Sequence, residues 1–390
     1  MNHGVFYTLR KHWKKSTFAA IAAVYGIHFM TQKHRANIVR RRLCQEAVQY
    51  GRQTIKSTAK QRRVVVFFNP KAGSGKTRKL LKDDAVPIFN LAGIDVIYIE
   101  LDYVGQAKTL VNYLDETTDT IVIAGGSGTV MEVITGLLTK YDEESKQCPL
   151  PIGIIPLGDE NTLFEKLLPD RCKNIPKARI IGEAALSIVK KESRMIDVMK
   201  ISPQESGKTI YSLSSVKWGI FRDIASDYDR YWLFGPLKKR MAYIAPVLFN
   251  WPPKYSIDIG FGASDNQKSL KNNDIKDTID NNPMIKEINK NIKTFNSFQI
   301  EIDANQTKNL AVSIWPEIID KKEFILKGWQ QINQKHSENN TEKLKTLTPS
   351  EIFLRPSRND MWYTIDGEDY EAYPILIKLL PNHIQMYYPS

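Results

Sequence analysis

The feature that most constrains the fold is a series of short apolar runs, rich in β-branched residues, that alternate with helical patterns from Arg62 onward. The apolar runs are Val64–Phe68, Val96–Glu100, Thr120–Ala124 and Ile152–Ile155. The helical patterns are Lys76–Leu91, Gln106–Leu114 and Val130–Leu138. This alternation predicts a parallel sheet covered by helices on both faces, with ligands bound beyond the carboxyl ends of the strands.

The first loop at those carboxyl ends runs from Asn69 to Thr77 and reads Asn-Pro-Lys-Ala-Gly-Ser-Gly-Lys-Thr. Its two glycines let backbone N–H groups approach phosphate oxygens closely, and its two lysines add positive charge. A Walker A loop is the main alternative, but Pro70 stands where that motif needs its first glycine. A tight strand-to-helix turn without a ligand is the other interpretation.

Two further loops follow the third and fourth apolar runs. Residues 125–129 read Gly-Gly-Ser-Gly-Thr, and residues 156–162 read Pro-Leu-Gly-Asp-Glu-Asn-Thr. The second loop is not a dinucleotide fingerprint, because Met131 stands where the third glycine belongs. A plain turn needs one glycine rather than three, so this loop indicates close approach to a phosphate or ribose. The third loop is a weak signal by itself.

Taken together, the order and spacing of the three loops resemble the catalytic domain of diacylglycerol and sphingosine kinases. The resemblance implies a phosphofructokinase-like nucleotide domain followed by a β-rich domain, with ATP and Mg²⁺ bound at the loops. It assigns ATP binding to Asn69, Lys71, Gly73, Ser74, Gly75, Lys76, Gly125, Gly126, Gly128, Thr129, Glu132, Pro156, Leu157 and Gly158.

The C-terminal run Ile-Asp-Gly-Glu at residues 365–368 carries the expected catalytic carboxylate. An acidic pair in a β-turn is ordinarily a solvated turn. The family resemblance instead makes Glu368 the general base that takes the proton from the acceptor hydroxyl during phosphoryl transfer.

One position departs from the family pattern, because Ser127 stands where the second loop of these kinases has Asp. A neutral hydroxyl is a poorer ligand for a hard cation such as Mg²⁺. Either another carboxylate replaces it, with Asp159, Glu160 and Asp366 as candidates, or the chain is a weak kinase or pseudokinase.

The second half of the chain is rich in strand patterns and poor in clear helices, which is typical of an antiparallel β-sandwich. The expected strands are Ile196–Ile201, Tyr211–Val216, Tyr255–Phe261, Phe298–Ile302, Leu310–Trp315 and Ile375–Leu380. The stretch 262–295 is rich in Asn, Lys and Asp and is expected to be a disordered surface insertion. The expected segments are therefore 1–60 (membrane or targeting), 61–194 (nucleotide-binding) and 195–390 (lipid-substrate).

Basic charge is concentrated at the N-terminus. The first 45 residues hold nine Lys or Arg and no acid, although the whole chain carries a formal net charge of +12. They flank the apolar stretch Ser16–Met30, which is shorter than a perpendicular membrane span. We expect a short or tilted span, an interfacial helix or a presequence rather than nucleic-acid binding. A buried helix at the start of the fold is the alternative.

Shorter motifs resemble the acylglycerol kinase branch of the family over nearly the whole chain. Examples are Trp218-Gly219, Gly235-Pro236-Leu237-Lys238 and Lys378-Leu379-Leu380-Pro381. The resemblance implies phosphorylation of monoacylglycerol and diacylglycerol at the mitochondrial inner membrane, facing the intermembrane space. Two alternatives remain, a non-catalytic subunit of the inner-membrane carrier translocase and a sphingoid-base or ceramide kinase.

A stretch that mixes aromatic and basic residues, 228–251, is expected to contact lipid, although helices packed on the sandwich explain it equally well. The expected lipid or membrane contacts are Trp232, Phe234, Lys238, Lys239 and Arg240.

Overall fold

The computed structural model of the chain describes residues 13–52, 60–73, 75–143, 148–158, 161–167, 175–204, 207–249, 251, 255–261, 292–304, 309–315, 320–332, 345–358 and 360–389. Three residues with expected roles, Ser74, Asp159 and Glu160, lie outside these ranges, as do residues 1–12 and most of the expected insertion.

The helical segments occupy both halves of the chain. They are α2 (Trp13–Gly51), α3 (Thr77–Leu80), η1 (Leu81–Ala85), α4 (Val86–Leu91), α5 (Gln106–Leu110), η2 (Val111–Tyr113), α6 (Ser127–Glu143), α7 (Thr162–Leu167), α8 (Lys177–Lys190), α9 (Ile220–Ser226), η3 (Tyr228–Leu237), α10 (Lys238–Phe249) and α12 (Lys321–Ile332).

The strands of the α/β half are β1 (Arg63–Phe68), β2 (Asp95–Glu100), β3 (Thr120–Gly125) and β4 (Ile152–Pro156). The later strands are β5 (Ser193–Pro203), β6 (Ile210–Ser212), β7 (Ser215–Gly219), β8 (Ser256–Phe261), β9 (Lys293–Asn296), β10 (Gln299–Ala304), β11 (Leu310–Ile314), β12 (Lys345–Leu347), β13 (Glu351–Pro356), β14 (Trp362–Ile365), β15 (Glu368–Glu371) and β16 (Ile375–Tyr387).

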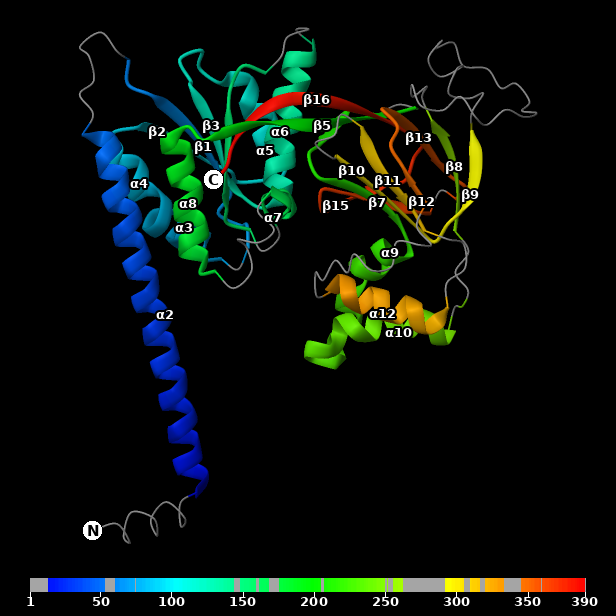
Figure 1. Ribbon diagram of the computed structural model, residues 1–390, viewed down its shortest axis with the longest axis horizontal. Helices are drawn as coiled ribbons and strands as arrows, with labels where there is room; N and C mark the ends of the chain where they lie inside the picture. The colour runs from blue at the N-terminus through cyan, green and yellow to red at the C-terminus, as the bar shows by residue number, and fades with distance from the viewer. Residues whose placement is uncertain are drawn as a thin grey trace.

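Within the described residues these strands form two sheets (Figure 1). The larger sheet runs β2-β1-β3-β4-β16-β13-β8-β9, with β5 and β6 paired beside β16, and the smaller runs β12-β11-β10-β7-β14-β15. Strands β1 to β4 pair in parallel, whereas the smaller sheet is antiparallel throughout. A parallel-sheet domain followed by an antiparallel domain confirms the predicted fold class.

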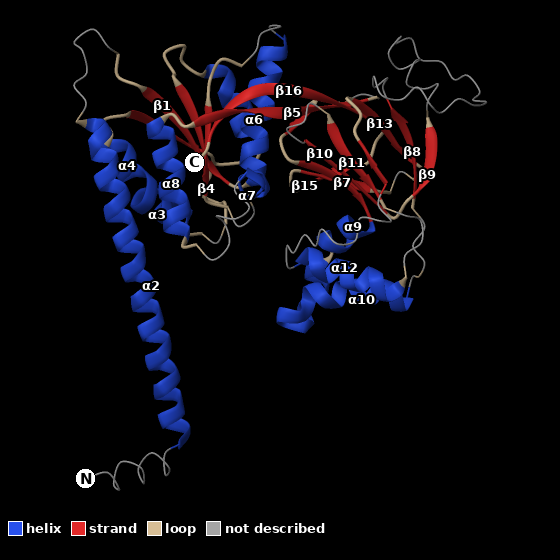
Figure 2. Cartoon of the chain, viewed as in Figure 1, coloured by secondary structure: helices blue, strands red, loops and turns tan. Residues whose placement is uncertain are grey.

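Helices cover both faces of the parallel strands (Figure 2), and successive side chains of each strand enter different cores. On β1, for example, Val64 and Val66 face α2, α4 and α8, while Val65 and Phe67 face α5 and α6. Burial on both faces explains why β1, β3 and β4 read as continuous apolar runs, whereas β2, at the edge of the sheet, leaves Ile97 and Tyr98 partly exposed. Because both faces of the sheet are covered, the carboxyl ends of the strands are the part of the sheet where a ligand can bind.

A long ribbon of two strands, β5 and β16, joins the two halves (Figure 1). The last residues of β16 pair in parallel with β4, at Met386 and Tyr387, so the chain returns to the α/β half at its end. A register shift between Leu380 and Ile384 bends the ribbon between the halves. Because these strands are shared, the second half is held against the first along a continuous sheet.

Below the smaller sheet lies a helical layer made of α9, η3, α10 and α12 (Figure 1). Aromatic side chains form its core, where the Phe221 ring stacks on Phe324 at 5.2 Å and meets Phe298 edge to face at 5.5 Å. Tyr243 of α10 is buried in the same cluster. Residues 228–249 are therefore helices packed on the sandwich, as the alternative interpretation stated, and their outer surface is considered below.

Helix α2 has two different halves. Its C-terminal part packs on α4 and α8 through buried Leu43 and Ala47, and Arg40 pairs with buried Asp84 at 2.5 Å. Its N-terminal part extends away from the body (Figure 1). No helix among the described residues is long and apolar enough to cross a membrane. The C-terminal part of α2 therefore belongs to the fold, but the alternative interpretation of a buried helix is wrong for the apolar stretch Ser16–Met30, where Phe18, Ile21 and Val24 are exposed.

Three local predictions differ from the structure. The expected helix 130–138 begins earlier, at Ser127, so most of the second glycine loop is helical. The expected strand 211–216 is broken into β6 and β7, because the turn between them binds a buried carboxylate. The expected insertion ends sooner, because residues 293–295 belong to β9, which pairs with β8.

Candidate active site

A cavity of about 690 Å³ lies between the carboxyl ends of the parallel strands and the edge of the smaller sheet. The first half of the chain lines it from the first loop, from α5, from the start of α6 and from Gly158. The second half contributes Lys208 and Ile210 near β6, and Gly367, Glu368 and Tyr370 from the β14–β15 hairpin. The three expected loops and the expected catalytic carboxylate therefore meet at one place.

The first loop is fixed by its own side chains. Asn69 donates from Nδ2 to the Thr129 hydroxyl at 3.0 Å, and its Oδ1 accepts the Lys71 N–H at 3.0 Å. The Thr77 hydroxyl donates to the carbonyls of Pro70 and Ala72. Positive φ at Gly73 and Gly75 completes the turn. These bonds tie the first loop to the beginning of α6 and leave Asn69 and Gly73 in the cavity wall.

The beginning of α6 forms the floor of the cavity, through Gly126, Ser127, Gly128 and Thr129. The first turn of a helix presents N–H groups that have no acceptor within the helix, and its dipole favours negative charge. A 17-residue helix that starts at a cavity is suited to hold phosphate groups there. The sequence placed this binding in a loop, whereas the structure places it at a helix terminus.

Gly128 and Glu368 are in direct contact across the cleft. A Cβ atom added to Gly128 would overlap Oε1 of the Glu368 carboxylate. A side chain at residue 128 would therefore push the Glu368 carboxylate, which is the end of a flexible and exposed side chain, away from the first turn of α6. The family resemblance gave Gly128 to the nucleotide and Glu368 to the acceptor, and the structure brings the two side by side.

Ser127 takes part in a small network that joins the two halves. Its hydroxyl accepts the Thr162 backbone N–H at 3.1 Å and lies 3.2 Å from the Thr162 hydroxyl. That hydroxyl in turn donates to the Asp366 carbonyl at 3.3 Å. Ser127 thus ties the start of α6 to the start of α7 and to the hairpin that carries Glu368.

Asp366 has a structural position and is not a cavity residue. Its buried carboxylate accepts hydrogen bonds from the Ser212 hydroxyl at 2.8 Å and from the backbone N–H groups of Leu213, Ser214 and Ser215 at 2.7–2.9 Å. Burial raises the pKa of this carboxyl, although the four donors oppose the shift. Because its oxygens are already engaged, the geometry argues against Asp366 as a metal ligand. It anchors the hairpin at a left-handed residue, with φ 50°.

Two lysines in the cavity wall were not predicted to bind a ligand. Lys108 comes from α5 and Lys208 from the segment before β6. Burial lowers the pKa of Lys108, and the positive charge of Lys208 lowers it further. Two like charges converging on a cavity favour an anionic ligand. The sequence assigned neither of them a binding role, because they lie 100 residues apart and meet only in the fold.

The carboxylates of Glu132 and Glu368 also line the cavity. Oxygen donors of this kind suit Mg²⁺, which takes one or two carboxylates together with water and phosphate oxygens. Among the described residues, no cluster of three or more His, Cys, Asp or Glu forms a complete metal site. The donor set therefore fits a cation that arrives with a nucleotide.

Tyr370 closes the cavity beside Glu368. Its hydroxyl donates to the Met131 sulfur at 2.9 Å. Burial and the neighbouring Glu368 carboxylate raise the pKa of Tyr370 to about 12, so the hydroxyl stays protonated at neutral pH. It is a fixed donor on the wall and does not take up a proton there.

Several expected ATP-binding residues support the cavity from outside its wall. Lys71 donates to the Asp102 carbonyl at 2.7 Å, and Lys76 caps α3. The Gly125 carbonyl accepts the N–H groups of both Leu157 and Gly158 at 3.0 Å. Pro156 pairs with Gly125 at the end of β4, and Gly75 shapes the first loop. The expected lipid contacts, which include Trp232 and Phe234, lie on the helical layer, away from this cavity.

Named protein families and relatives resemble this chain along most of its length. The family described as "Diacylglycerol kinase catalytic domain" matches residues 63–201, and the family described as "Acylglycerol kinase C-terminal" matches residues 213–305 and 276–390. The chain is 33% identical to "Acylglycerol kinase, mitochondrial" of Xenopus laevis, with 97% of this chain and 94% of that protein covered. The protein of the same name from Homo sapiens is 32% identical, with 98% and 96% covered.

More distant relatives share only part of the chain. "Sphingosine kinase 1" of Arabidopsis thaliana is 30% identical over 46% of this chain and 36% of its own length. Among solved structures, a diacylglycerol kinase from Bacillus anthracis superimposes with a TM-score of 0.56 at 19% identity, covering 85% of this chain and 99% of that one. This last likeness establishes the fold alone.

Proposed function

Because the chain belongs to the acylglycerol kinase family of lipid kinases, we propose that it transfers the γ-phosphate of ATP to monoacylglycerol and diacylglycerol, giving lysophosphatidic and phosphatidic acid. The observation that carries the proposal is the contact between Glu368 and the first turn of α6 inside one cavity. A base and a phosphate-binding helix terminus must lie this close for in-line transfer.

The phosphates of ATP would lie at the start of α6, with Lys108 and Lys208 compensating their charge. Mg²⁺, when bound with ATP, would neutralise charge on the transferred group, with the Glu132 carboxylate in the cavity wall as an oxygen donor, which leaves Glu368 to act as the base.

Glu368 accepts the proton of the acceptor hydroxyl as that oxygen bonds to the γ-phosphorus. The bond between the γ-phosphorus and the bridging oxygen breaks at the same time, and ADP leaves with the electron pair. Asp366 and the Ser127–Thr162 network hold the hairpin so that Glu368 faces the phosphates. Tyr370 and Met131 exclude water from that side of the cavity.

We expect Ser127 to slow turnover more than it weakens ATP binding. A hydroxyl engaged by Thr162 supplies little charge to a cation, whereas an Asp would supply a full negative charge. Loss of one positioned electrostatic group commonly costs about 10²–10³-fold in rate. ATP binding through glycine backbone N–H groups and lysine ammonium groups does not depend on a carboxylate at residue 127.

The proposed site of action is the mitochondrial inner membrane, facing the intermembrane space. Support comes from the word mitochondrial in the names of the relatives and from the exposed apolar part of α2 with its flanking basic residues. Apolar residues that point to all sides of a helix are typical of one that is covered by lipid or protein.

A second candidate function is a non-catalytic subunit of the inner-membrane carrier translocase, and both functions can coexist in one chain. The observation in its favour is that a Ser127 hydroxyl engaged by Thr162 stands at the position of the family Asp, while α2 is helical from Trp13 to Gly51. If the chain is such a subunit, other translocase subunits should co-purify with it. This association should be lost when residues 1–45 are deleted. Persistence of the complex after that deletion would show that α2 is not the contact.

The test of the main proposal is transfer of radiolabelled phosphate from ATP to lipids presented in detergent micelles. Monoacylglycerol, diacylglycerol, sphingosine and ceramide form the substrate panel, because a sphingoid-base or ceramide kinase would use the same cavity. Wild type is compared with Ser127→Asp and Glu368→Gln. We expect slow transfer to the glycerolipids, faster transfer with Ser127→Asp, and transfer about 10²–10⁴-fold slower than wild type with Glu368→Gln. No transfer by wild type or by Ser127→Asp would reject the proposal.

A further inference from the structure

We propose that the outer surface of η3 and α10 is a second membrane-contact surface, which binds an anionic phospholipid bilayer together with the N-terminal half of α2. We call residues Tyr228–Phe249 the helical tip. The proposal concerns where the chain sits on a bilayer and does not depend on whether it transfers phosphate.

The helical tip exposes large apolar side chains that its own core does not use. Trp232 is 70% exposed, Leu233 76%, Leu248 70% and Phe249 81%. In a helix on the surface of a soluble domain, this outward face is normally polar. Contiguous exposed apolar residues rimmed by polar ones mark contact with a partner or a membrane.

The backbone of the tip explains why these side chains face outward. Gly235 has φ 49° and Pro236 follows it, so the chain turns sharply between η3 and α10. No residue of η3 is buried. On α10, by contrast, Ala242, Tyr243 and Val247 are buried against the aromatic core. The inner side of α10 thus holds the fold, which leaves Trp232 at the corner and Leu248 at the end of α10 exposed. Phe249 is exposed as well and also lines a cavity with Arg230 and Tyr231.

Basic side chains border this outer surface. Lys239 lies over the Tyr228 ring at 5.5 Å and Arg240 over the Trp329 ring at 5.7 Å. Arg230 is 78% exposed, and its nearest acid, Asp227, is 3.9 Å away. Lys238 pairs with Asp229, which is the one acid within the tip, since Asp227 lies just before it. Cations therefore exceed acids, and aromatic rings lie beside them, as is typical of a surface that meets anionic head groups.

The position of the tip in the molecule selects a bilayer as its occupant. The helical layer and the free end of α2 both extend toward the lower side of the view in Figure 1, while the β5–β16 ribbon lies at the opposite side. Phe18, Ile21 and Val24 on that part of α2 are also exposed, with Lys14 and Lys15 beside them. A flat anionic surface can contact both regions at once.

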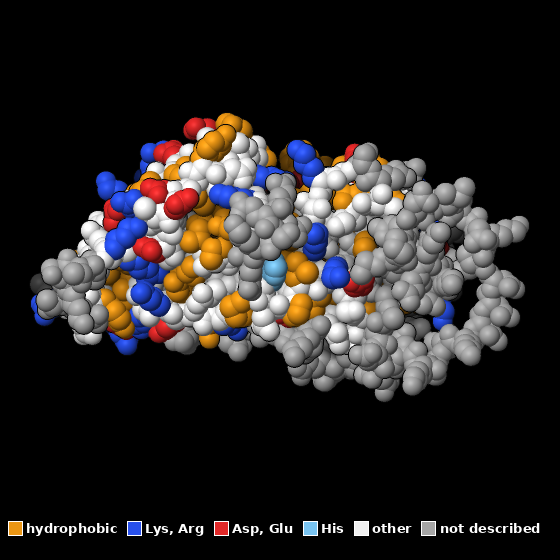
Figure 3. All heavy atoms as spheres, turned by 90° about the horizontal axis from the view of Figure 1, so that it is seen from above, with side chains coloured by type: hydrophobic (Ala, Val, Ile, Leu, Met, Phe, Trp, Pro, Cys, Tyr) orange, Lys and Arg blue, Asp and Glu red, His pale blue; other side chains and the backbone are white. Residues whose placement is uncertain are grey.

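The opposite surface of the molecule differs. Seen from above, Lys and Arg side chains are interspersed with Asp and Glu over the α/β half (Figure 3). Such a mixed surface gives no net attraction to anionic lipid. Binding through the tip and α2 would place the carboxyl ends of the parallel strands, where the cavity lies, on the bilayer side of the sheet.

The experiment measures co-sedimentation of the full chain with phosphatidylcholine vesicles, with and without phosphatidylglycerol, in the absence of ATP. The tip variants are Leu233→Asp and Phe249→Asp. The matched control is Tyr113→Asp, because Tyr113 is 80% exposed but belongs to η2, outside the tip. Circular dichroism and thermal melting check that every variant folds.

We expect wild type and Tyr113→Asp to bind anionic vesicles equally, and each tip variant to bind about tenfold more weakly, since each loses the burial of one large apolar side chain. The difference should persist when Phe18, Ile21 and Val24 are all changed to Ser, where the tip is the remaining contact. Tip variants that bind as tightly as Tyr113→Asp would overturn the proposal. Equal binding of wild type to neutral and anionic vesicles would overturn its electrostatic part. Because no ATP is used, this outcome is independent of the kinase assay.

Discussion

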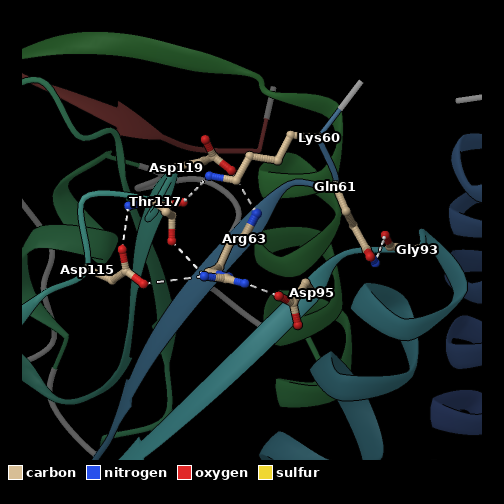
Figure 4. A network of polar contacts seen from close by, with 8 residues as sticks. All are labelled: Lys60, Gln61, Arg63, Gly93, Asp95, Asp115, Thr117 and Asp119. Carbon is tan, nitrogen blue, oxygen red and sulfur yellow. Dashed lines mark hydrogen bonds and ion pairs between the residues drawn. The ribbon is translucent and has the colours of Figure 1, made fainter. Parts of the chain in front are cut away.

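The two ends of the parallel sheet differ in how their charged side chains are arranged. At the amino ends, Arg63 of β1 donates to Asp95 at 3.0 Å, to Asp115 at 3.4 Å and to the Thr117 hydroxyl at 2.6 Å, and its backbone N–H donates to Asp119 (Figure 4). At the carboxyl ends, Lys108, Lys208, Glu132 and Glu368 converge on a cavity from four separate elements. The groups around Arg63 satisfy one another within the fold, whereas the four side chains at the carboxyl ends face a space that a ligand can enter.

The amino end shows what a structural charge network looks like in this protein. Thr117 bonds Asp115 through its N–H and accepts Lys60 through its carbonyl, so each strand end is tied to the next (Figure 4). Backbone and side-chain donors of Thr117 lower the pKa of Asp115. The carboxyl end instead has two lysines that repel each other, which no stability argument favours. We infer that the Arg63 network stabilises the sheet, whereas the charged residues around the cavity serve binding and phosphoryl transfer.

The largest effect should follow from Glu368→Gln. Glutamine keeps the size of the side chain but cannot take the proton from the acceptor hydroxyl, so we expect kcat to fall by about 10²–10⁴-fold. ATP binding and the urea midpoint should be unchanged within error. Steady-state kinetics and urea unfolding measure both. A fall in ATP affinity equal to the fall in kcat would mean that Glu368 serves binding and not proton transfer.

Gly128→Ala should come next, because a Cβ atom there displaces the Glu368 carboxylate. A shift of about 1 Å at a reacting group can cost about 10²-fold in rate. The control is Gly26→Ala, since Gly26 lies in α2 with open space around its Cα. In a Glu368→Ala background, Gly128→Ala should cause no additional loss of kcat. A further loss in that background would assign Gly128 to the nucleotide instead.

Lys108→Met should raise the KM for ATP by about tenfold or more, because a charge-assisted bond to phosphate contributes about 1.5–3 kcal/mol. The pKa of Lys108 is lowered by burial and by Lys208, so its positive charge is lost at a lower pH than that of an ordinary lysine. ATP affinity of wild type should therefore weaken as pH rises from about 7 to about 10, and less so in Lys108→Met. If KM for ATP depends on pH in the same way in wild type and in Lys108→Met, Lys108 does not bind the phosphates.

The smallest effect on activity should follow from Arg63→Met at the amino end. The guanidinium holds several groups but is about one-third exposed, at 32%, so solvent screening limits the loss to about 1–2 kcal/mol of unfolding free energy. Arg179→Met, which removes an exposed pair within one helix turn, should cost about 0.3–0.5 kcal/mol. Both variants should keep wild-type kcat. A large loss of kcat in Arg63→Met would undo the distinction between the two ends.

The sequence predicted the sheet well because β1, β3 and β4 are buried on both faces and read as unbroken apolar runs. The edge strand β2 is also apolar, although Ile97 and Tyr98 are partly exposed. The glycine loops could also be recognised from the sequence, since few residues other than glycine let backbone N–H groups approach a phosphate closely. The extra length of β16 was not predicted beyond Leu380, because its return to β4 depends on pairing with residues far away in the chain. The break at residues 213–214 was missed because its cause is a carboxylate about 150 residues later, at Asp366.

Of the site, the sequence supplied the loops and Glu368 but not the way they meet. Lys108 and Lys208 lie 100 residues apart, so only the fold brings their charges together. The start of α6 was placed too late, because glycine and serine at residues 126–128 are weak helix formers that tertiary contacts with Thr162 and Glu368 override. Asp366 had the residue type of a metal ligand, and only its four donors reveal its structural position.

The central claim is that one cavity at the carboxyl ends of the sheet holds ATP beside Glu368. A structure of the wild-type chain with Mg²⁺ and a non-hydrolysable ATP analogue tests it most directly. We predict the γ-phosphate between the first turn of α6 and the Glu368 carboxylate, with the Nζ atoms of Lys108 and Lys208 within hydrogen-bond distance of phosphate oxygens. A nucleotide bound elsewhere, or a γ-phosphate out of reach of Glu368, would contradict the account.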